Sequence, residues 1–169
     1  MLGGMQDRDL FALALGLSKP WYVSSVEFEP EEKRLDLRID FESGGTFACP
    51  DCGAAGCKAY DTEERSWRHL NFFQFETHLR ARMPRVRCGE HGIRPVVAPW
   101  ARPGSGFTLL FEALVMTMAA HMPVRAIARL LGVADMRLWR VIDHYVEQAR
   151  RERDDSEVRR VGIDETSVA

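Results

Sequence analysis

Residues 122–133 read MPVRAIARLLGV, and this stretch decides how the second half of the chain folds. The small side chains of Ala126 and Ala128 allow a second helix to cross closely, while Ile127 belongs to the apolar face of a first helix. Gly132 can adopt the positive φ of a tight turn after that helix. The pattern predicts the first helix and the turn of a helix-turn-helix, although a plain helical hairpin with a glycine stop would look the same.

Helical periodicity continues on both sides of this stretch, from Phe107 before it and from about Asp135 to Arg151 after it. In a helix-turn-helix the helix after the turn lies in a major groove of DNA. We expect its inward side chains to be Leu138, Ile142, Tyr145 and Val146. Four arginines in or beside the predicted motif are candidate contacts to bases or phosphates: Arg125, Arg129, Arg137 and Arg140.

Two pairs of metal-ligating residue types, each separated by two residues, lie in the first half of the chain. Cys49 and Cys52 enclose Pro-Asp, and Cys88 and His91 enclose Gly-Glu. This spacing lets a tight turn point both side chains at one ion, and two such turns complete a tetrahedron of three thiolates and one imidazole. A closed site of four protein ligands leaves no position for water, so the sequence predicts a structural Zn²⁺.

The gap of 35 residues between the two pairs is longer than in compact zinc ribbons. A hairpin within the gap would bring its ends together, which favours the zinc site. Cys57 is a spare cysteine that leaves two alternatives open. It replaces one of the four ligands, or the cysteines are buried thiols without metal.

Alternation of apolar and charged residues predicts strands before the helical region. Trp21 to Phe28 and Lys33 to Phe41 form a hairpin around the acidic turn 29–32, and residues 71–88 form a strand or hairpin with Pro84 at an edge or bulge. Alternate positions place Arg80 and Arg82 on one face of this run, and Arg85 and Arg87 similarly beyond the break at Pro84. These four arginines are candidate phosphate contacts or an ordinary solvated face.

These elements predict an α+β chain with a small β-rich zinc-binding domain followed by an all-α domain. We expect an N-terminal helix within residues 1–20, the β-rich domain over 21–100 and the helix-turn-helix domain over 106–153. The boundary falls in a passage rich in proline and glycine, residues 94–106.

The net charge of −2 is unevenly distributed. Residues 1–64 carry −7, residues 65–120 carry +5, residues 121–153 carry +3 and residues 154–169 carry −3. The basic middle coincides with the motifs above, which favours a nucleic-acid partner over a merely solvated face. We find no membrane span and no signal peptide in the sequence, so we expect a cytoplasmic protein whose cysteines are metal ligands or buried thiols.

Several segments of the chain, in this order, resemble insertion-sequence transposases of the ISL-three type. The resemblance runs from about Tyr22 to the last residue. The segments that carry it are CPDC (49–52), WRHLNFFQ (67–74), VRCGEHG (86–92), PWARPGSGFT (99–108), the helix-turn-helix, LWRVIDHYV (138–146) and VGIDETS (161–167).

The resemblance implies a DNA-binding N-terminal part of a bacterial transposase, which recognises the terminal inverted repeats of its element. Its partner is then double-stranded DNA, its location is the nucleoid, and a homodimer is left open. Family members cut and rejoin DNA with an RNase H-like domain that holds an Asp-Asp-Glu triad and Mg²⁺. Residues 158–169 resemble the first strand of that domain, which makes Asp164 the first triad carboxylate. Since the later carboxylates would lie beyond Ala169, we expect no activity from this chain alone and Mg²⁺ only in a full-length parent.

A function of another class fits the same residues. The chain is then a zinc-stabilised protein-interaction or transcription-regulator module without specificity for transposon ends. Binding to terminal-repeat DNA discriminates between the two functions.

Overall fold

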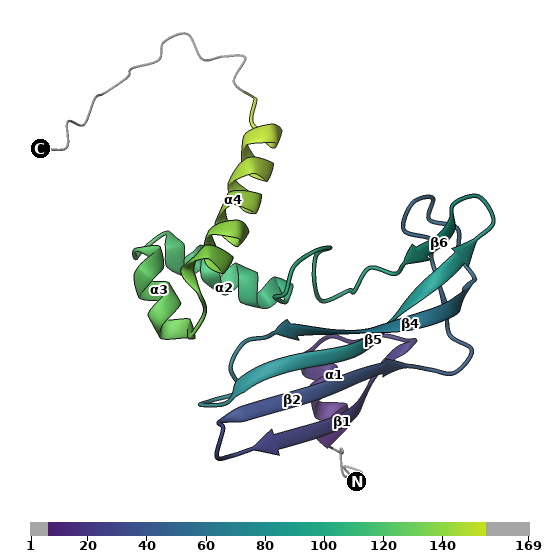
Figure 1. Ribbon diagram of the computed structural model, residues 1–169, viewed down its shortest axis with the longest axis horizontal. Coiled ribbons are helices and arrows are strands. Elements are labelled where there is room, and N and C mark those ends of the chain that lie inside the picture. The colour runs from purple at the N-terminus through teal and green to yellow at the C-terminus, as the bar shows by residue number, and fades with distance from the viewer. Residues whose placement is uncertain (1–6, 155–169) are drawn as a thin grey trace, which may run out of the picture. The chain divides into compact units, whose positions relative to one another are not determined.

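A computed structural model describes residues 7–154 of the chain. The chain divides into two compact units, Met1–Leu114 and Val115–Ala169, each of which is described by itself. The first unit is built around a β-sheet and the second consists of helices (Figure 1), so the predicted α+β class is confirmed. The predicted RNase H-like strand at 158–169 lies outside the described residues.

Among the described residues, the first unit contains α1, a six-stranded sheet and the first turns of α2. Figure 1 shows α1 beside the strands of the sheet. The strands lie in the order β1-β2-β5-β4-β3, with β6 paired to β5. Strands β2 and β5 run parallel to each other, and the other pairs of these strands are antiparallel. The elements are α1 (Asp7–Ala14), β1 (Trp21–Glu29), β2 (Arg34–Phe41), β3 (Thr46–Phe47), β4 (Cys57–Arg68), β5 (Glu76–Cys88) and β6 (Gly92–Pro95).

The first two strands form the predicted hairpin. Their register runs from Trp21 opposite Phe41 to Glu29 opposite Arg34, with an irregularity after Val23. The connecting turn is closed by the N–H of Lys33, which donates to the carbonyl of Pro30 over 3.2 Å. Alternation of apolar and charged residues therefore gave the correct strands and the correct turn.

Strand β5 is paired along both of its edges. It lies beside β4 on one edge and, on the other, beside β2 up to Ala81 and beside β6 from Arg85. Pro84 stands where the partner changes, and its carbonyl accepts the N–H of Val96 over 2.9 Å. Because the N–H and C=O of a strand residue point to the same side, the missing N–H of Pro84 faces this change of partner and not β4.

The core of the first unit lies on one face of the sheet. Leu35, Leu37 and Ile39 of β2 and Leu79 of β5 are at most 2% exposed, as their alternation predicts. Aromatic side chains complete the core with edge-to-face contacts between rings. These contacts include Trp21 with Trp100, Trp67 with Trp100, and Phe11 of α1 with Phe72.

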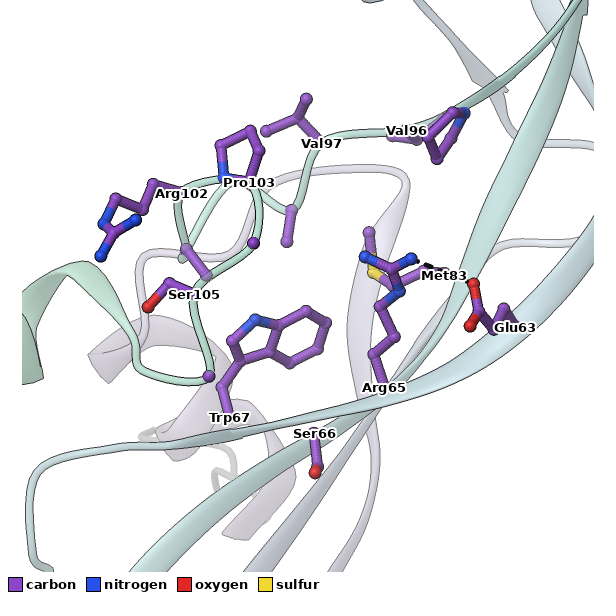
Figure 2. A pocket seen from close by; sticks show the side chains of 15 residues that line it. Glu63, Arg65, Ser66, Trp67, Met83, Val96, Val97, Arg102, Pro103 and Ser105 are labelled. Carbon is purple, nitrogen blue, oxygen red and sulfur yellow. Dashed lines mark hydrogen bonds and ion pairs between the residues drawn. The ribbon is translucent and has the colours of Figure 1, made fainter. Parts of the chain in front are cut away.

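The segment after β6 returns to strand β4. The N–H of Arg68 donates to the carbonyl of Gly106 over 2.9 Å, and the N–H of Thr108 donates to the carbonyl of Arg68 over 3.1 Å. A pocket of about 400 Å³ lies between this segment and β4. Figure 2 shows Arg65 and Trp67 of β4 on one side of it and the loop with Arg102 on the other.

The remaining helices are α2 (Leu109–Ala119), which begins in the first unit, α3 (Val124–Leu131) and α4 (Asp135–Glu152). Gly132 ends α3 with φ 64° and ψ 31°, and its N–H donates to the carbonyl of Ala128. This left-handed conformation costs glycine little because it has no Cβ. None of the helices within residues 7–154 is long and apolar enough to cross a membrane.

The interior of the second unit differs from the prediction in one residue of α4. Leu138 is fully buried, and Ile142 and Tyr145 are half-buried, as expected. Val146, however, is 38% exposed, and Val141 is the second fully buried side chain of the helix at 1% exposure. The inward face therefore follows the spacing Leu138, Val141 and Tyr145, which leaves other apolar side chains of α4 at the surface.

Candidate metal centre and helix-turn-helix

The first pair of cysteines lies in a tight turn just after β3. The N–H of Gly53 donates to the carbonyl of Cys49 over 2.8 Å, and the N–H of Cys49 donates to the carbonyl of Ala54 over 2.9 Å. Gly53 has φ 73°, a conformation that favours glycine. Cys49 is buried and Cys52 is exposed. The turn therefore holds one thiol in the interior of the protein and one at its surface.

The second pair lies in the turn between β5 and β6. Cys88 is the last residue of β5 and pairs with Gly92, the first residue of β6, so His91 is held in the turn between them. The backbone N–H and the imidazole of His91, together with the backbone N–H of Glu90, lower the pKa of the Cys88 thiol to about 6. These donors favour the thiolate, the form that binds metal.

The four predicted metal ligands come together at one end of the sheet. Their ligand atoms all lie within 4.8 Å of one another: Cys49, Cys52, Cys88 and His91. The Sγ atoms of Cys52 and Cys88 are 3.7 Å apart, and Cys88 Sγ is 3.7 Å from the Nδ1 atom of His91. The antiparallel pairing of β4 and β5 folds the long gap between the pairs back on itself, which closes the site.

The two distances of 3.7 Å from Cys88 Sγ fit a zinc ion. A tetrahedron with Zn–S near 2.3 Å and Zn–N near 2.0 Å has S···S edges of about 3.8 Å and S···N edges of about 3.6 Å. The backbone N–H of Ala54 favours the Cys52 thiolate, but partial desolvation and the neighbouring thiols of Cys49 and Cys88 outweigh it and raise the pKa of Cys52 to about 11. Thiols this close ionise together only beside a cation, and three sulfurs with one imidazole are a donor set typical of zinc.

Cys57 is not a member of the four-residue cluster. It is the first residue of β4, it is partly buried against the core, and its Sγ lies 3.5 Å from the carbonyl oxygen of Ala54. Burial and the nearby thiols of Cys88 and Cys49 raise its pKa. Its surroundings are those of a packing residue that sits close to the metal ligands.

The arginines of the predicted helix-turn-helix lie at its surface. Arg125 and Arg129 are one turn apart on α3 and line a hollow that also includes Gly132 and Asp135. On α4, Arg137 is in the first turn and Arg140 in the second, and both are exposed. All four side chains therefore lie within the motif that α3, Gly132 and α4 form.

The four arginines of β5 are at least partly exposed, but they are engaged within the chain. Arg80 donates to Asp36 over 2.8 Å, and Arg82 donates to Asp40 over 3.0 Å. The Nε of Arg85 donates to Asp61 over 2.6 Å, and the guanidinium of Arg87 lies 4.6 Å from the centre of the Tyr60 ring. Alternation groups Arg80 with Arg82 and Arg85 with Arg87, but it could not predict these partners, which are distant in sequence.

The segment WRHLN positions the first turn of α2, a role that sequence reasoning missed. Arg68 is 5% exposed and donates to the carbonyls of His69 and Thr77, over 2.5 and 3.2 Å. Its guanidinium also lies 5.4 Å from the centre of the Phe111 ring. His69 Nδ1 is 2.8 Å from the hydroxyl of Thr108, and burial beside Arg68 lowers the pKa of His69 to about 4.

Family comparisons identify the same two modules. Residues 97–146 match the helix-turn-helix domain of transposase family ISL3, and residues 45–91 match the zinc-finger of transposase IS204/IS1001/IS1096/IS1165. The chain belongs to the ISL3 transposase family. The zinc-finger match contains the four clustered ligands, and the helix-turn-helix match contains the α3–Gly132–α4 motif.

Two curated relatives are each described as "Transposase for insertion sequence element IS1557", from Mycobacterium tuberculosis strains CDC 1551 and H37Rv. Each is 30% identical to this ISL3 chain over 174 residues, which is 96% of the chain and 38% of the relative. The chain thus spans less than two fifths of the length of these relatives. No solved structure matches the chain.

Proposed function

We propose that this ISL3-family chain binds double-stranded DNA at the terminal inverted repeats of an insertion sequence. The observation that carries the proposal is the α3–Gly132–α4 motif, whose surface presents four arginines. The family match supports the assignment of this motif as a helix-turn-helix of a transposase. Such a ligand implies a location with the chromosome, in the cytoplasm.

The second helix of the motif would lie in the major groove. Arg137 and Arg140 are three residues apart on α4, so they project within about 60° of each other on the helix surface. Long cationic side chains at these positions can reach the edges of guanines, which discriminates one sequence from another. Arg125 and Arg129 would contact phosphates, which hold the protein on the duplex without reading its sequence.

The arginines of β5 contribute less to DNA binding in this proposal. Arg80, Arg82 and Arg85 would have to exchange a carboxylate partner for a phosphate, and this exchange cancels most of the gain. Arg87 stacks on the ring of Tyr60, and this contact does not use its N–H groups. These N–H groups can therefore donate to a phosphate more readily than those of the three paired arginines. Of the four β5 arginines considered as phosphate contacts, we therefore propose that Arg87 alone makes a minor contact, at the edge of the DNA site.

The zinc ion would be structural in this proposal. Cys49 and Cys52 follow β3, while Cys88 and His91 join β5 to β6, so an ion held by all four ties these segments together. The ion supplies a cross-link and no reaction, since its four positions are filled by protein.

The proposal for catalysis rests on the resemblance of residues 161–167 alone. Asp164 would be the first carboxylate of an Asp-Asp-Glu triad that binds Mg²⁺ in a full-length transposase, and it lies outside the described residues. Several carboxylates are needed to hold the two metal ions of such a reaction.

The test compares binding to a terminal-repeat duplex and to a scrambled duplex of the same length and composition. We expect the chain to prefer the terminal repeat. Arg137→Ala and Arg140→Ala should each reduce that preference by about 1–3 kcal/mol. Arg38→Ala is the matched control, because Arg38 is a half-exposed arginine of the sheet that pairs with Glu27. Equal binding to both duplexes, or unchanged preference in both helix variants, would refute recognition by α4.

A further inference from the structure

Helix α4 presents a methionine and an arginine directly opposite its inward face. That face is formed by Leu138 and Val141, which are buried, and by Tyr145, which is half-buried. At 100° per residue, Met136 lies about 170° around the helix from the middle of the inward face, and Arg140 lies about 40° from Met136. Met136 is 64% exposed, and Arg140 is exposed as well. The outermost side chains of the first two turns are therefore a thioether and a guanidinium.

The same side of α4 becomes acidic in the turns that follow. Asp143 and Glu147 lie within about 20° of Met136 around the helix, and both are exposed. Carboxylates at these positions are repelled by the phosphates of a duplex. The first two turns are thus the part of this side that can approach DNA closely, which agrees with the way the N-terminal residues of a recognition helix contact base edges.

The chemistry of Met136 restricts the base that it can contact favourably. A thioether donates no hydrogen bond and accepts only weakly, so it leaves an amino or carbonyl group on a base edge without a partner. The 5-methyl group of thymine is the apolar group that a base pair presents in the major groove. A flexible methionine side chain can adapt its shape to such a methyl group.

We propose that Met136 packs against the 5-methyl group of a thymine in the terminal repeat, near a guanine bound by Arg140. This contact rests on the proposed function and adds to it the base that one position of α4 selects. Met136 and Arg140 are four residues apart, which is about 6 Å along the helix axis. Since successive bases of a strand are about 3.4 Å apart, the thymine and the guanine lie within about two base pairs of each other.

The test removes the methyl group and nothing else. Each thymine of the terminal-repeat duplex is replaced in turn by deoxyuridine, which keeps the base pair and lacks the 5-methyl group. At one position, binding of the zinc-loaded wild-type chain should weaken about fourfold, the loss expected for one buried methyl group. Met136→Ala should bind the thymine and deoxyuridine duplexes equally at that position, because its side chain is too short to reach the methyl group. Fluorescence anisotropy of labelled duplexes measures both ratios.

Leu130→Ala is the matched control. Leu130 is 66% exposed, close to the exposure of Met136, and it lies on α3 instead of α4. This variant should keep the fourfold discrimination between thymine and deoxyuridine. Circular dichroism verifies that each variant is folded.

A second series of duplexes locates the guanine. Replacement by 7-deazaguanine removes the N7 acceptor that an arginine uses. It should weaken wild-type binding, and leave binding of Arg140→Ala unchanged, at a guanine within two base pairs of the sensitive thymine. A sensitive guanine farther away would contradict the placement of these two side chains on neighbouring base pairs.

The result separates failure of this contact from failure of the proposed function. A chain that prefers the terminal repeat but is insensitive to deoxyuridine at every position overturns the contact and leaves the proposed function standing. Sensitivity that Met136→Ala retains does the same. Equal binding of the wild-type chain to terminal-repeat and scrambled duplexes overturns the proposed function, and the thymine contact with it.

Discussion

Single side chains at the metal centre differ in role although they lie within a few ångströms of one another. Cys52 is the exposed member of the cluster, while Cys57 is partly buried and its sulfur lies near a backbone carbonyl. The exposed thiol of Cys52 contributes little to packing, and its place in the cluster fits a metal ligand. A partly buried thiol is explained by its packing alone.

Substitution of these two cysteines separates the roles. Cys52→Ser should reduce bound zinc from about one ion per chain to almost none and lower the melting temperature of the sheet, because three remaining ligands hold zinc far more weakly. Cys57→Ser should retain the zinc. Elemental analysis and thermal denaturation measure both effects. Full zinc in Cys52→Ser, together with loss in Cys57→Ser, would transfer the ligand role to Cys57.

His69 is the residue through which acid should destabilise the sheet unit. Its pKa is about 4 in the folded chain, against about 6.5 when unfolded, so the unfolded chain binds more protons between these values. The stabilisation is complete above pH 6.5 and is lost as the pH falls towards 4, by up to about 3 kcal/mol. Urea denaturation at a series of pH values should show this loss and a flatter profile for His69→Asn.

The exposed His144 provides the control for that experiment. His144→Asn leaves the buried imidazole in place, so it should retain the wild-type pH profile. Zinc ligands also titrate in acid, but all three proteins share them, and the difference between the two variants isolates His69. Identical profiles for His69→Asn and His144→Asn would show that His69 is protonated in the folded chain.

At the scale of elements, the start of α2 depends on a buried carboxylate. Glu112 is fully buried and accepts hydrogen bonds from Arg102 over 3.0 Å and from Ser105 over 2.6 Å. Thr108 supports the same turn, because its hydroxyl accepts the N–H of Phe111. The segment with Arg102 and Ser105 is thereby fastened to the first turn of the helix.

Removal of this carboxylate should cost more than removal of a surface partner. Glu112→Ala leaves Arg102 and Ser105 without their acceptor and should lower the free energy of unfolding by about 3 kcal/mol. Glu27→Ala breaks an ion pair with Arg38 whose members are about half exposed, so it should cost less than about 1 kcal/mol. Chemical denaturation measures both. Equal losses would mean that Glu112 makes no net contribution beyond that of a surface charge.

Local elements were predictable from the sequence and pairings between distant elements were not. The hairpin of β1 and β2 followed from alternation around one turn. Helix α3 and the turn at Gly132 followed from residues 122–133, and α4 followed from the helical periodicity after them. The parallel pairing of β2 with β5 joins strands far apart in the chain, and no local pattern specifies it. The partners of the β5 arginines, Asp36, Asp40 and Asp61, are also far from them in the sequence, so no local pattern predicted these ion pairs.

The metal cluster was partly predictable, because it combines local features with a pairing between distant segments. Each ligand pair is a local feature, since a separation of two residues is what a tight turn requires. Their convergence is not local, but the strand-like gap between them made a connecting hairpin the simplest solution. Val146 shows that helical periodicity alone does not decide which apolar residues of a helix are buried. Both Val141 and Val146 fit a helical apolar face, and only packing against the rest of the unit decided which one is buried.

For the whole molecule, the distribution of charge matters more than the net value of −2. Many acidic residues of the first unit are already paired with its arginines, as in Arg34 with Asp36 and Arg80 with the same carboxylate. These ion pairs neutralise part of the positive charge of the sheet. The arginines of α3 and α4 are then the cationic groups best placed to release counterions from DNA.

The salt dependence of DNA binding should show that the arginines of α3 and α4, and not those of the sheet, contact the phosphates. With contacts from Arg125 and Arg129 and further contacts from α4, about three or four phosphates are neutralised, so log K should fall with log salt at a slope near −3. Arg125→Ala and Arg129→Ala should each reduce the magnitude of the slope by about one unit and weaken terminal-repeat and scrambled duplexes equally. Arg80→Ala, which removes a partner of Asp36, should leave the slope nearly unchanged. A slope that falls with Arg80→Ala and not with Arg125→Ala would place the DNA on the sheet instead of on the helix-turn-helix, because only residues at the phosphates release counterions.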